Sequence, residues 1–279
     1  MTEESKIVTV QVDAGVPREK QSGLVCAAYS EPGARSSQQD SLFCGERDGM
    51  LLAAVCDGMG GMNGGEIASG IAARIFAEAF YAQELSDPAG FLEEMAHKAD
   101  EAVFGLSEGG RPMGAGSTIV SVLIRGRSLY WLSVGDSRIY LFRRGELLCP
   151  VRPHNYGELL RSRLAEGKIS GEAYRAGLKN AEALISFLGI GGLKLMEANR
   201  QPFWLEDGDQ VLLCSDGLYR SLPEERIREL LMSGANPSVL ARNLVQEAVE
   251  AGGIRQDNTS AVLIRCQFAR KGPETEPEP

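Results

Sequence analysis

Two apolar runs in this chain each end in an Asp-Gly pair, and this ending is the feature that most restricts the fold. "LLAAVC" at residues 51–56 leads into Asp57-Gly58, and "VLLC" at residues 211–214 leads through one serine into Asp216-Gly217. An Asp-Gly pair between two strands usually marks a hairpin turn. Here no second strand-like run follows within a few residues, so a hairpin does not explain either pair. We expect both aspartates at strand ends, where the following loop can face a ligand.

A third Asp-Gly pair, Asp207-Gly208, has a different context. It lies in "LEDGDQ" between two short strand-like runs, at about residues 201–205 and 210–214. The sequence therefore predicts an ordinary hairpin turn at this point.

Helices are predicted where the apolar period changes to about four. Residues 66–83 carry apolar side chains every four positions on a broad stripe, which is typical of a helix packed on a core. Ser86-Asp87-Pro88 predicts the start of a second helix, which we expect to end near Gly109-Gly110. Pro223 and Asn236-Pro237 predict two later helices.

The runs "STIVSVLI", "SLYWLSV" and "RIYLFRR" are separated only by "RGR" and "GDS", which predicts an antiparallel meander of three strands. Helices placed between such groups of strands predict an α+β fold, a four-layer α-β-β-α sandwich of two antiparallel sheets flanked by helices. Residues 22–268 form one domain in this interpretation. Residues 1–21 are a polar segment that could add an edge strand, and the charged, proline-rich tail at 269–279 is expected to be disordered.

Composition excludes several classes of protein. The net charge is −9 and no basic patch is evident, which argues against a nucleic-acid partner. No run approaches the ~20 apolar residues of a membrane span, and the start of the chain does not resemble a signal peptide, so we expect a cytoplasmic protein with no membrane partner. The six cysteines lie mostly in apolar runs and are expected to be free thiols in a reducing compartment. Two histidines are too few for a histidine-rich zinc site.

Five aspartates share a position at a junction between a strand and a loop. They are Asp40, Asp57, Asp136, Asp216 and Asp257. Five carboxylates aimed at one place repel one another unless some are protonated or hard cations neutralise them. Ligands that are all oxygen suit Mg²⁺ or Mn²⁺, and the carbonyl of Gly58 could add another.

Six segments now carry a resemblance to a known family. They are "ARSSQQD" (34–40), "CDGMGG" (56–61), "GSTIV" (116–120), "VGDSRIYL" (134–141), "LLCSDGL" (212–218) and "DNTSAVLI" (257–264). Each is weak alone, but in this order and spacing they resemble the metal-dependent protein phosphatases, the protein phosphatase 2C family, and especially its bacterial members. The resemblance spans Arg35 to Ile264 and implies a β-sandwich flanked by helices. Residues 22–268 would then be the catalytic domain.

The resemblance also implies a metal centre. Asp57 is expected to bridge two ions, with the Gly58 carbonyl completing the second, while Asp216 and Asp257 hold the first. Asp136 resembles the residue that binds a third ion together with the Asp216 position.

Two further residues resemble substrate-handling positions of the family. Asp40 is expected to hold water at the metals, and Arg35 to grip the substrate phosphate with its planar fork. Gln38 stands where the family usually has asparagine, a change that we expect to be tolerated. Met59 replaces the histidine of animal relatives, so no general acid is assigned. His154 lies in a segment that loosely resembles the family's variable flap, and we expect it to pack in a loop.

These expectations favour a phosphoserine/phosphothreonine protein phosphatase that uses two, and with the Asp136 position three, Mn²⁺ or Mg²⁺ ions. Its partners would be phosphorylated proteins and a cognate serine/threonine kinase, and the chain would be a monomer. Two alternatives stay open: a catalytically inactive sensor or scaffold on the same fold, and another two-metal hydrolase such as a nuclease, which the acidic balance disfavours.

Overall fold

The structure is a computed structural model that describes residues 23–60, 64–108 and 111–268. The predictions of an edge strand within residues 1–21 and of a disordered tail at 269–279 lie outside these residues.

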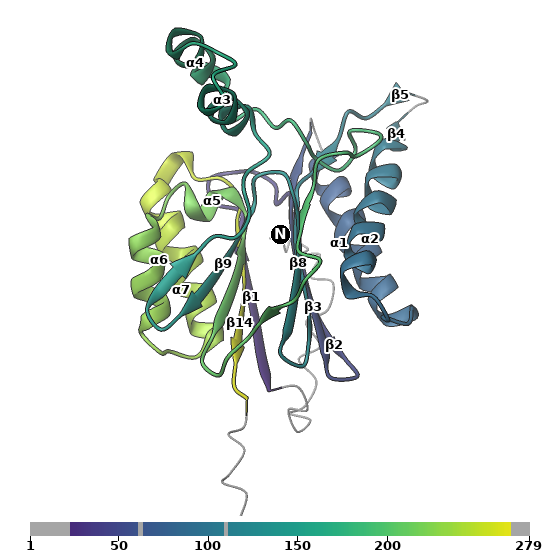
Figure 1. Ribbon diagram of the computed structural model, residues 1–279, viewed down its shortest axis with the longest axis vertical. Coiled ribbons are helices and arrows are strands. Elements are labelled where there is room, and N and C mark those ends of the chain that lie inside the picture. The colour runs from purple at the N-terminus through teal and green to yellow at the C-terminus, as the bar shows by residue number, and fades with distance from the viewer. Residues whose placement is uncertain (1–22, 61–63, 109–110, 269–279) are drawn as a thin grey trace, which may run out of the picture.

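Two antiparallel sheets face each other (Figure 1). The five-stranded sheet has the order β1 (Leu24–Glu31), β14 (Thr259–Cys266), β13 (Gln210–Cys214), β9 (Arg138–Arg143), β10 (Glu146–Leu148). The seven-stranded sheet has the order β11 (Glu197–Ala198), β8 (Ser128–Val134), β7 (Ile119–Arg125), β3 (Met50–Met59), β2 (Asp40–Arg47), with β6 (Gly116–Ser117) paired to β3 and β12 (Phe203–Trp204) to β8. A small separate hairpin joins β4 (Ser107–Glu108) to β5 (Arg111–Pro112).

Helices cover the outer face of each sheet, which confirms the predicted four-layer α-β-β-α sandwich (Figure 1). The seven-stranded sheet is covered by α1 (Gly64–Ala82) and α2 (Pro88–Phe104). The five-stranded sheet is covered by α5 (Asp216–Tyr219), α6 (Glu224–Met232) and α7 (Pro237–Gly252). A flap unit projects from one end of the sandwich; it comprises α3 (Tyr156–Ala165), α4 (Gly171–Gly177) and the 3₁₀ turn η1 (Leu178–Asn180). Among the described residues, no helix is long and apolar enough to span a membrane.

The continuous apolar run of β3 follows from burial on both faces. Leu51, Ala53 and Val55 pack between the sheets, whereas their neighbours Leu52 and Ala54 pack under α1 and α2. The same alternation holds in β13. The alternation continues to the end of β3. Asp57, two residues after Val55, therefore faces the space between the sheets.

The predicted three-strand meander is wrong at its second turn. β7 and β8 do pair, but β9 pairs with β13 in the opposite sheet. The chain crosses between the sheets at Gly135, whose φ of 103° favours glycine. A Cβ there would also approach the Thr118 side chain to 2.6 Å. This crossing places Asp136 at the end of the sandwich, between the two sheets.

The predicted hairpin at Asp207-Gly208 is also wrong. A turn does form, with the Asp209 N–H donating to the Glu206 carbonyl at 3.2 Å. The strands that flank it nevertheless belong to opposite sheets, because β12 pairs with β8 and β13 pairs with β9 and β14. The same turn residues suit a hairpin within one sheet and a connection between two sheets. The Asp-Gly dipeptide alone therefore could not distinguish the two.

Both long helices begin as predicted, but the second ends earlier. Asp87 caps α2 by accepting a hydrogen bond from the Gly90 N–H, and Pro88 follows at the first helical position. The helix ends at Phe104 and not near Gly109, since Gly105 already serves as its C-cap. Gly105 takes the capping position in a right-handed conformation, and its N–H donates to the Glu101 carbonyl at 3.0 Å.

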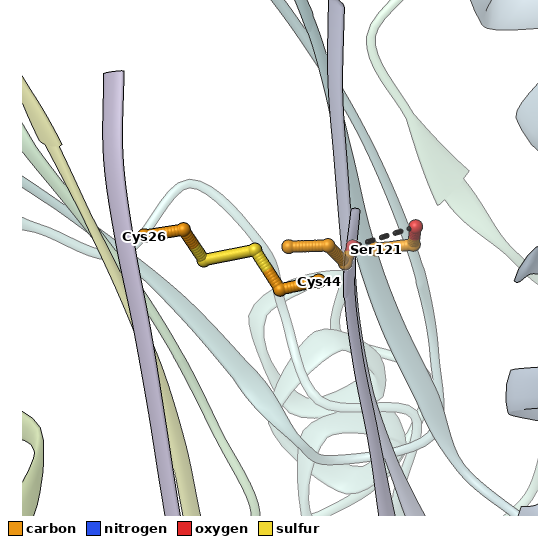
Figure 2. The surroundings of a disulfide bond; sticks show 4 residues. Cys26, Cys44 and Ser121 are labelled. Carbon is orange, nitrogen blue, oxygen red and sulfur yellow. Dashed lines mark hydrogen bonds between the residues drawn. A yellow bond between two sulfur atoms is a disulfide. The ribbon is translucent and has the colours of Figure 1, made fainter. Parts of the chain in front are cut away.

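One pair of cysteines contradicts the prediction of six free thiols. A disulfide joins Cys26 of β1 to Cys44 of β2 and so links the two sheets (Figure 2). Near it, the Ser121 hydroxyl donates to the Ala53 carbonyl at 2.9 Å. The sequence could not reveal this pairing, because it depends on which strands face each other across the sandwich. Cys56, Cys149, Cys214 and Cys266 are free thiols as predicted.

Asp100 in α2 is a buried carboxylate that organises the segment at residues 189–193. It is 1% exposed and accepts hydrogen bonds from the backbone N–H groups of Gly189, Gly191, Gly192 and Leu193, at 2.8–3.2 Å. The preceding residue, Leu188, bridges to Ser117 of β6, which pairs with Gly58. Asp100 therefore fixes a loop that borders the end of β3.

We predict that Asp100→Asn lowers the free energy of unfolding by about 3 kcal/mol, because an amide group would face two of the N–H donors. Urea unfolding measures this change. Glu101→Ala, an exposed neighbour on the same helix, is the control and should change stability by less than about 0.5 kcal/mol. Equal effects of the two substitutions would contradict the prediction.

Candidate metal centre

Two of the predicted acids lie directly opposite each other on adjacent strands. Asp40 is the first residue of β2, and its register partner on β3 is Asp57. Register partners point to the same face of a sheet, and two like charges in this position are unfavourable. The pair therefore needs either protons or cations near it.

The other three acids reach the same end of the sandwich from different connections. Asp216 is the first residue of α5 and follows β13 after one serine. Asp136 lies at the crossing from β8 to β9, and Asp257 comes directly before Asn258 and β14. Asp136 is 4% exposed and Asp40 is 8% exposed.

The electrostatics show that these five acids share one site. Burial raises the pKa of Asp57 well above its usual range, and the charges of Asp40, Asp216, Asp136 and Asp257 raise it further. Burial raises the pKa of Asp40 to about 7, helped by the charges of Asp216 and Asp257. Burial also raises the pKa of Asp216 to about 6. Thus the predicted acids come together and oppose one another's ionisation.

Arginines pair with three of the five acids. Within the part of the chain that the structure describes, no three acidic, histidine or cysteine side chains are already grouped as ligands of one ion. Arg35 Nη2 contacts Asp257 Oδ2 at 2.6 Å. Arg220 lies against both Asp136, at 3.2 Å, and Asp216, at 3.0 Å. These ion pairs offset part of the mutual repulsion of the acids in the absence of metal.

One carboxylate oxygen supports the fit of a cation. Asp40 Oδ2 accepts a hydrogen bond from the Ser215 hydroxyl at 2.8 Å, whereas Asp40 Oδ1 is buried without a hydrogen-bond partner. A buried carboxylate oxygen left unpaired is costly. Carboxylate oxygens also match the ligand preference of Mg²⁺ and Mn²⁺. The residues present therefore fit a hard divalent cation.

Gly58 occupies a position that only glycine can fill. Its N–H donates to the Gln39 carbonyl at 3.0 Å, and its backbone pairs with Ser117. A Cβ on Gly58 would lie 2.1 Å from the Gly65 carbonyl oxygen, near the start of α1. The close approach of α1 explains why a glycine follows Asp57.

Asn258 is a supporting residue whose role the sequence interpretation missed. Its side-chain oxygen accepts from the Gln39 N–H at 2.8 Å, and its amide donates to the carbonyls of Pro32, at 3.0 Å, and Ser37, at 2.9 Å. These bonds hold the loop that carries Arg35. The asparagine in "DNTS" was the available clue, since an amide that both donates and accepts suits such a clamp.

Gln38 has a clear structural role in place of the usual asparagine. Its carbonyl oxygen accepts from the Asp40 N–H at 2.9 Å, and its amide donates to the Ser30 hydroxyl at 2.8 Å. It therefore supports the start of β2.

His154 packs inside the structure, as the sequence interpretation favours. It is 4% exposed, and burial lowers the pKa of its imidazole. Its Nδ1 accepts from the Gly135 N–H at 3.2 Å, and its own backbone N–H donates to the Gly135 carbonyl at 2.7 Å. The histidine thus fixes the crossing that carries Asp136.

Comparisons with known proteins agree with this geometry. A family model described as protein phosphatase 2C matches residues 31–247. The chain is 29% identical over 235 residues to the serine/threonine phosphatase stp of Listeria monocytogenes, covering 81% of this chain and 88% of that protein. The Streptococcus agalactiae serine/threonine phosphatase superposes with a TM-score of 0.76 at 25% identity, covering 87% of this chain and 99% of the other. The catalytic domain of the phosphatase PstP, solved with two manganese ions, superposes with a TM-score of 0.70 at 27% identity, covering 87% and 97%.

Proposed function

The chain belongs to the protein phosphatase 2C family, and from this premise we propose how its residues carry out the family's reaction. It is a metal-dependent protein phosphatase that hydrolyses phosphoserine and phosphothreonine with Mn²⁺ or Mg²⁺. The observation that carries this conclusion is the convergence of five acids, four of which raise the pKa of the fifth, Asp57. Five ionised carboxylates in one site repel one another, and this repulsion is offset only where cations bind.

The proposed ligands follow from the site. Asp57 and the Gly58 carbonyl would hold ions from the seven-stranded sheet, and Asp216 and Asp257 would hold them from the other sheet. Asp136 lies beside Asp216 at the position where the family resemblance implies a third ion, but Arg220 contacts both carboxylates there. When bound, two ions attract the phosphate dianion and lower the pKa of a water molecule so that it can attack phosphorus.

Residues of the chain would position the substrate phosphate and a water molecule. Arg35 has a side chain that is 59% exposed, so it can leave Asp257 and present its guanidinium fork to a phosphate. Asp40 accepts a hydrogen bond from Ser215 through Oδ2 and has a second, buried oxygen with no hydrogen-bond partner, which suits it to orient a water molecule. The Asn258 clamp on the 32–39 loop keeps Arg35 within reach.

Phosphorylated proteins are the substrates, and we further propose a cognate serine/threonine kinase whose work this enzyme reverses. We take residues 22–268 as the catalytic domain and the monomer as the working unit. The compartment that we propose is the cytoplasm; the four free thiols, three of them buried, support it, whereas the Cys26–Cys44 disulfide counts against it. Sedimentation of the purified chain and fractionation of cells test the last two points.

Hydrolysis of p-nitrophenyl phosphate and of a phosphothreonine peptide tests the function. We predict that metal-free protein is inactive and that added Mn²⁺ or Mg²⁺ raises the rate at least about tenfold. DNA and RNA incubated under the same conditions should remain intact. Turnover that persists in EDTA, or cleavage of nucleic acid without peptide dephosphorylation, would overturn the proposal.

A further inference from the structure

Arg220 stands among carboxylates that the proposed metals would share. It follows α5, the short helix that opens with Asp216. Its three guanidinium nitrogens each contact a different acid: Nε contacts Asp216 at 3.0 Å, Nη2 contacts Asp136 at 3.2 Å and Nη1 contacts Glu182 at 2.6 Å. A single fixed positive charge therefore lies between two site acids and one outside the site.

The neighbours of Arg220 hold it in this position. Its backbone N–H donates to the Asp216 carbonyl at 3.0 Å. The adjacent Tyr219 hydroxyl donates to the Asp136 carbonyl at 3.0 Å, and Arg138 stacks 3.8 Å over the Tyr219 ring. The Arg220 side chain is 37% exposed, so it is partly enclosed. A guanidinium anchored in this way is part of the site and not a free surface charge.

Asp136 and Asp216 are the two acids proposed to hold a third ion. Both carboxylates are well covered, with side-chain exposures of 5% and 16%. The guanidinium already neutralises part of their charge and uses one oxygen of each. A divalent ion could occupy the same place only by displacing it, since two cations at this spacing repel each other.

The third contact links the site to the flap unit. Glu182 follows η1, and the segment around it is bonded to the start of α3, with the Gly157 N–H donating to the Ala181 carbonyl at 2.8 Å. The other ion pairs of this unit among the described residues are internal, Arg161 with Glu158 and Lys168 with Glu166. In the part of the chain that the structure describes, the Arg220–Glu182 contact is thus the ion pair that ties the projecting unit to the body of the protein.

We propose that Arg220 is a positioning residue that takes the place of a third metal ion between Asp136 and Asp216 and connects that place to Glu182 of the flap unit. This inference rests on the proposed function, because it presumes that metals bind at the other acids. Its consequences are that the wild-type chain binds two ions and that the charge of Arg220, not a third ion, holds the flap unit toward the site.

Metal stoichiometry tests the first consequence. Equilibrium dialysis against Mn²⁺ followed by elemental analysis should give two ions per wild-type chain and three per Arg220→Ala chain. Arg220→Lys retains the positive charge and should restore two. Arg226→Ala removes an exposed arginine that pairs with Glu229 and Glu247 away from the site, and it should leave the value at two.

The measured metal content distinguishes a failure of this inference from a failure of the proposed function on which it rests. A wild-type chain that binds no Mn²⁺ overturns both. A wild-type chain that binds three ions, or an Arg220→Ala chain that still binds two, overturns only the role of Arg220. Thermal unfolding of each variant verifies that it is folded before its metal content is counted.

Hydrogen exchange tests the second consequence without reference to activity. Glu182→Gln should speed exchange in residues 156–183 by about threefold, as expected for the loss of one exposed ion pair. It should leave two bound ions, because the Arg220 charge remains between Asp136 and Asp216. Unchanged exchange in both Glu182→Gln and Arg220→Ala would overturn the link to the flap unit.

Discussion

Replacing Asp57 with asparagine should lower phosphatase activity about a thousandfold. Asp57 lies at the centre of the site, since the charges of the other four acids all act on it. Asparagine keeps the size of the side chain but offers one neutral oxygen in place of two charged ones. Losing about 4 kcal/mol of electrostatic stabilisation of the transition state corresponds to this factor in rate. Initial rates at saturating Mn²⁺ measure it.

The fold should survive this substitution, which makes the test specific. The Asp57 backbone is held by the Thr118 N–H at 2.8 Å and by the strand pairing to β2, neither of which depends on the carboxylate. At pH 8 the metal-free variant should be more stable than the wild type, because the folded state opposes ionisation of Asp57, as its raised pKa shows, and asparagine does not ionise. Urea unfolding of metal-free protein checks this point.

Asp207→Asn is the matched control, because it changes the same Asp-Gly dipeptide in an exposed turn away from the site. It should leave both activity and metal binding unchanged. An Asp57→Asn enzyme that retains more than about a tenth of wild-type activity would contradict the assignment of Asp57 to the metal centre.

The sequence could predict the layers and the acids because both depend on local patterns. Runs buried on both faces, such as 51–56, identify central strands, and an acid directly after such a run lies at a rigid strand end. The pairing of strands was harder to predict. The turn at Gly135 crosses between sheets, and a local pattern of strand, short loop and strand is the same in a crossing as in a meander.

The remaining features that the sequence did not predict depend on contacts between segments far apart in the chain. Ser215 bonds to Asp40 across 175 positions, and Asn258 clamps residues 32–39 across more than 200. Arg220 meets Asp136 only because a crossing and a helix start converge at one end of the sandwich. The Cys26–Cys44 bond likewise depends on two strands of opposite sheets facing each other. Apart from the asparagine in "DNTS", none of these residues is marked in the sequence by spacing or by residue type.

The stability of the metal-free protein should fall as the pH rises from 5 to 8. Asp40, with a pKa of about 7, and Asp216, with a pKa of about 6, hold protons in the folded state that ordinary aspartates in the unfolded chain have already lost. Their folded pKa values lie above the unfolded ones, so the stability they contribute is complete at low pH and is lost as the pH passes through 6 and 7. The expected loss is on the order of 3 kcal/mol.

Urea unfolding at pH 5 and pH 8 on metal-free protein measures this slope, and added Mn²⁺ should reverse it. Bound cations favour the ionised carboxylates, so proton release then accompanies metal binding and stability rises with pH. Asp40→Asn should make the slope in metal-free protein less steep, because it removes the carboxyl group with the pKa of about 7 while Asp216 remains. Asp207→Asn should leave it unchanged. A metal-free protein that gains stability between pH 5 and pH 8 would mean that the acids are not held against one another, and the physical case for a cation site between the sheets would fail with them.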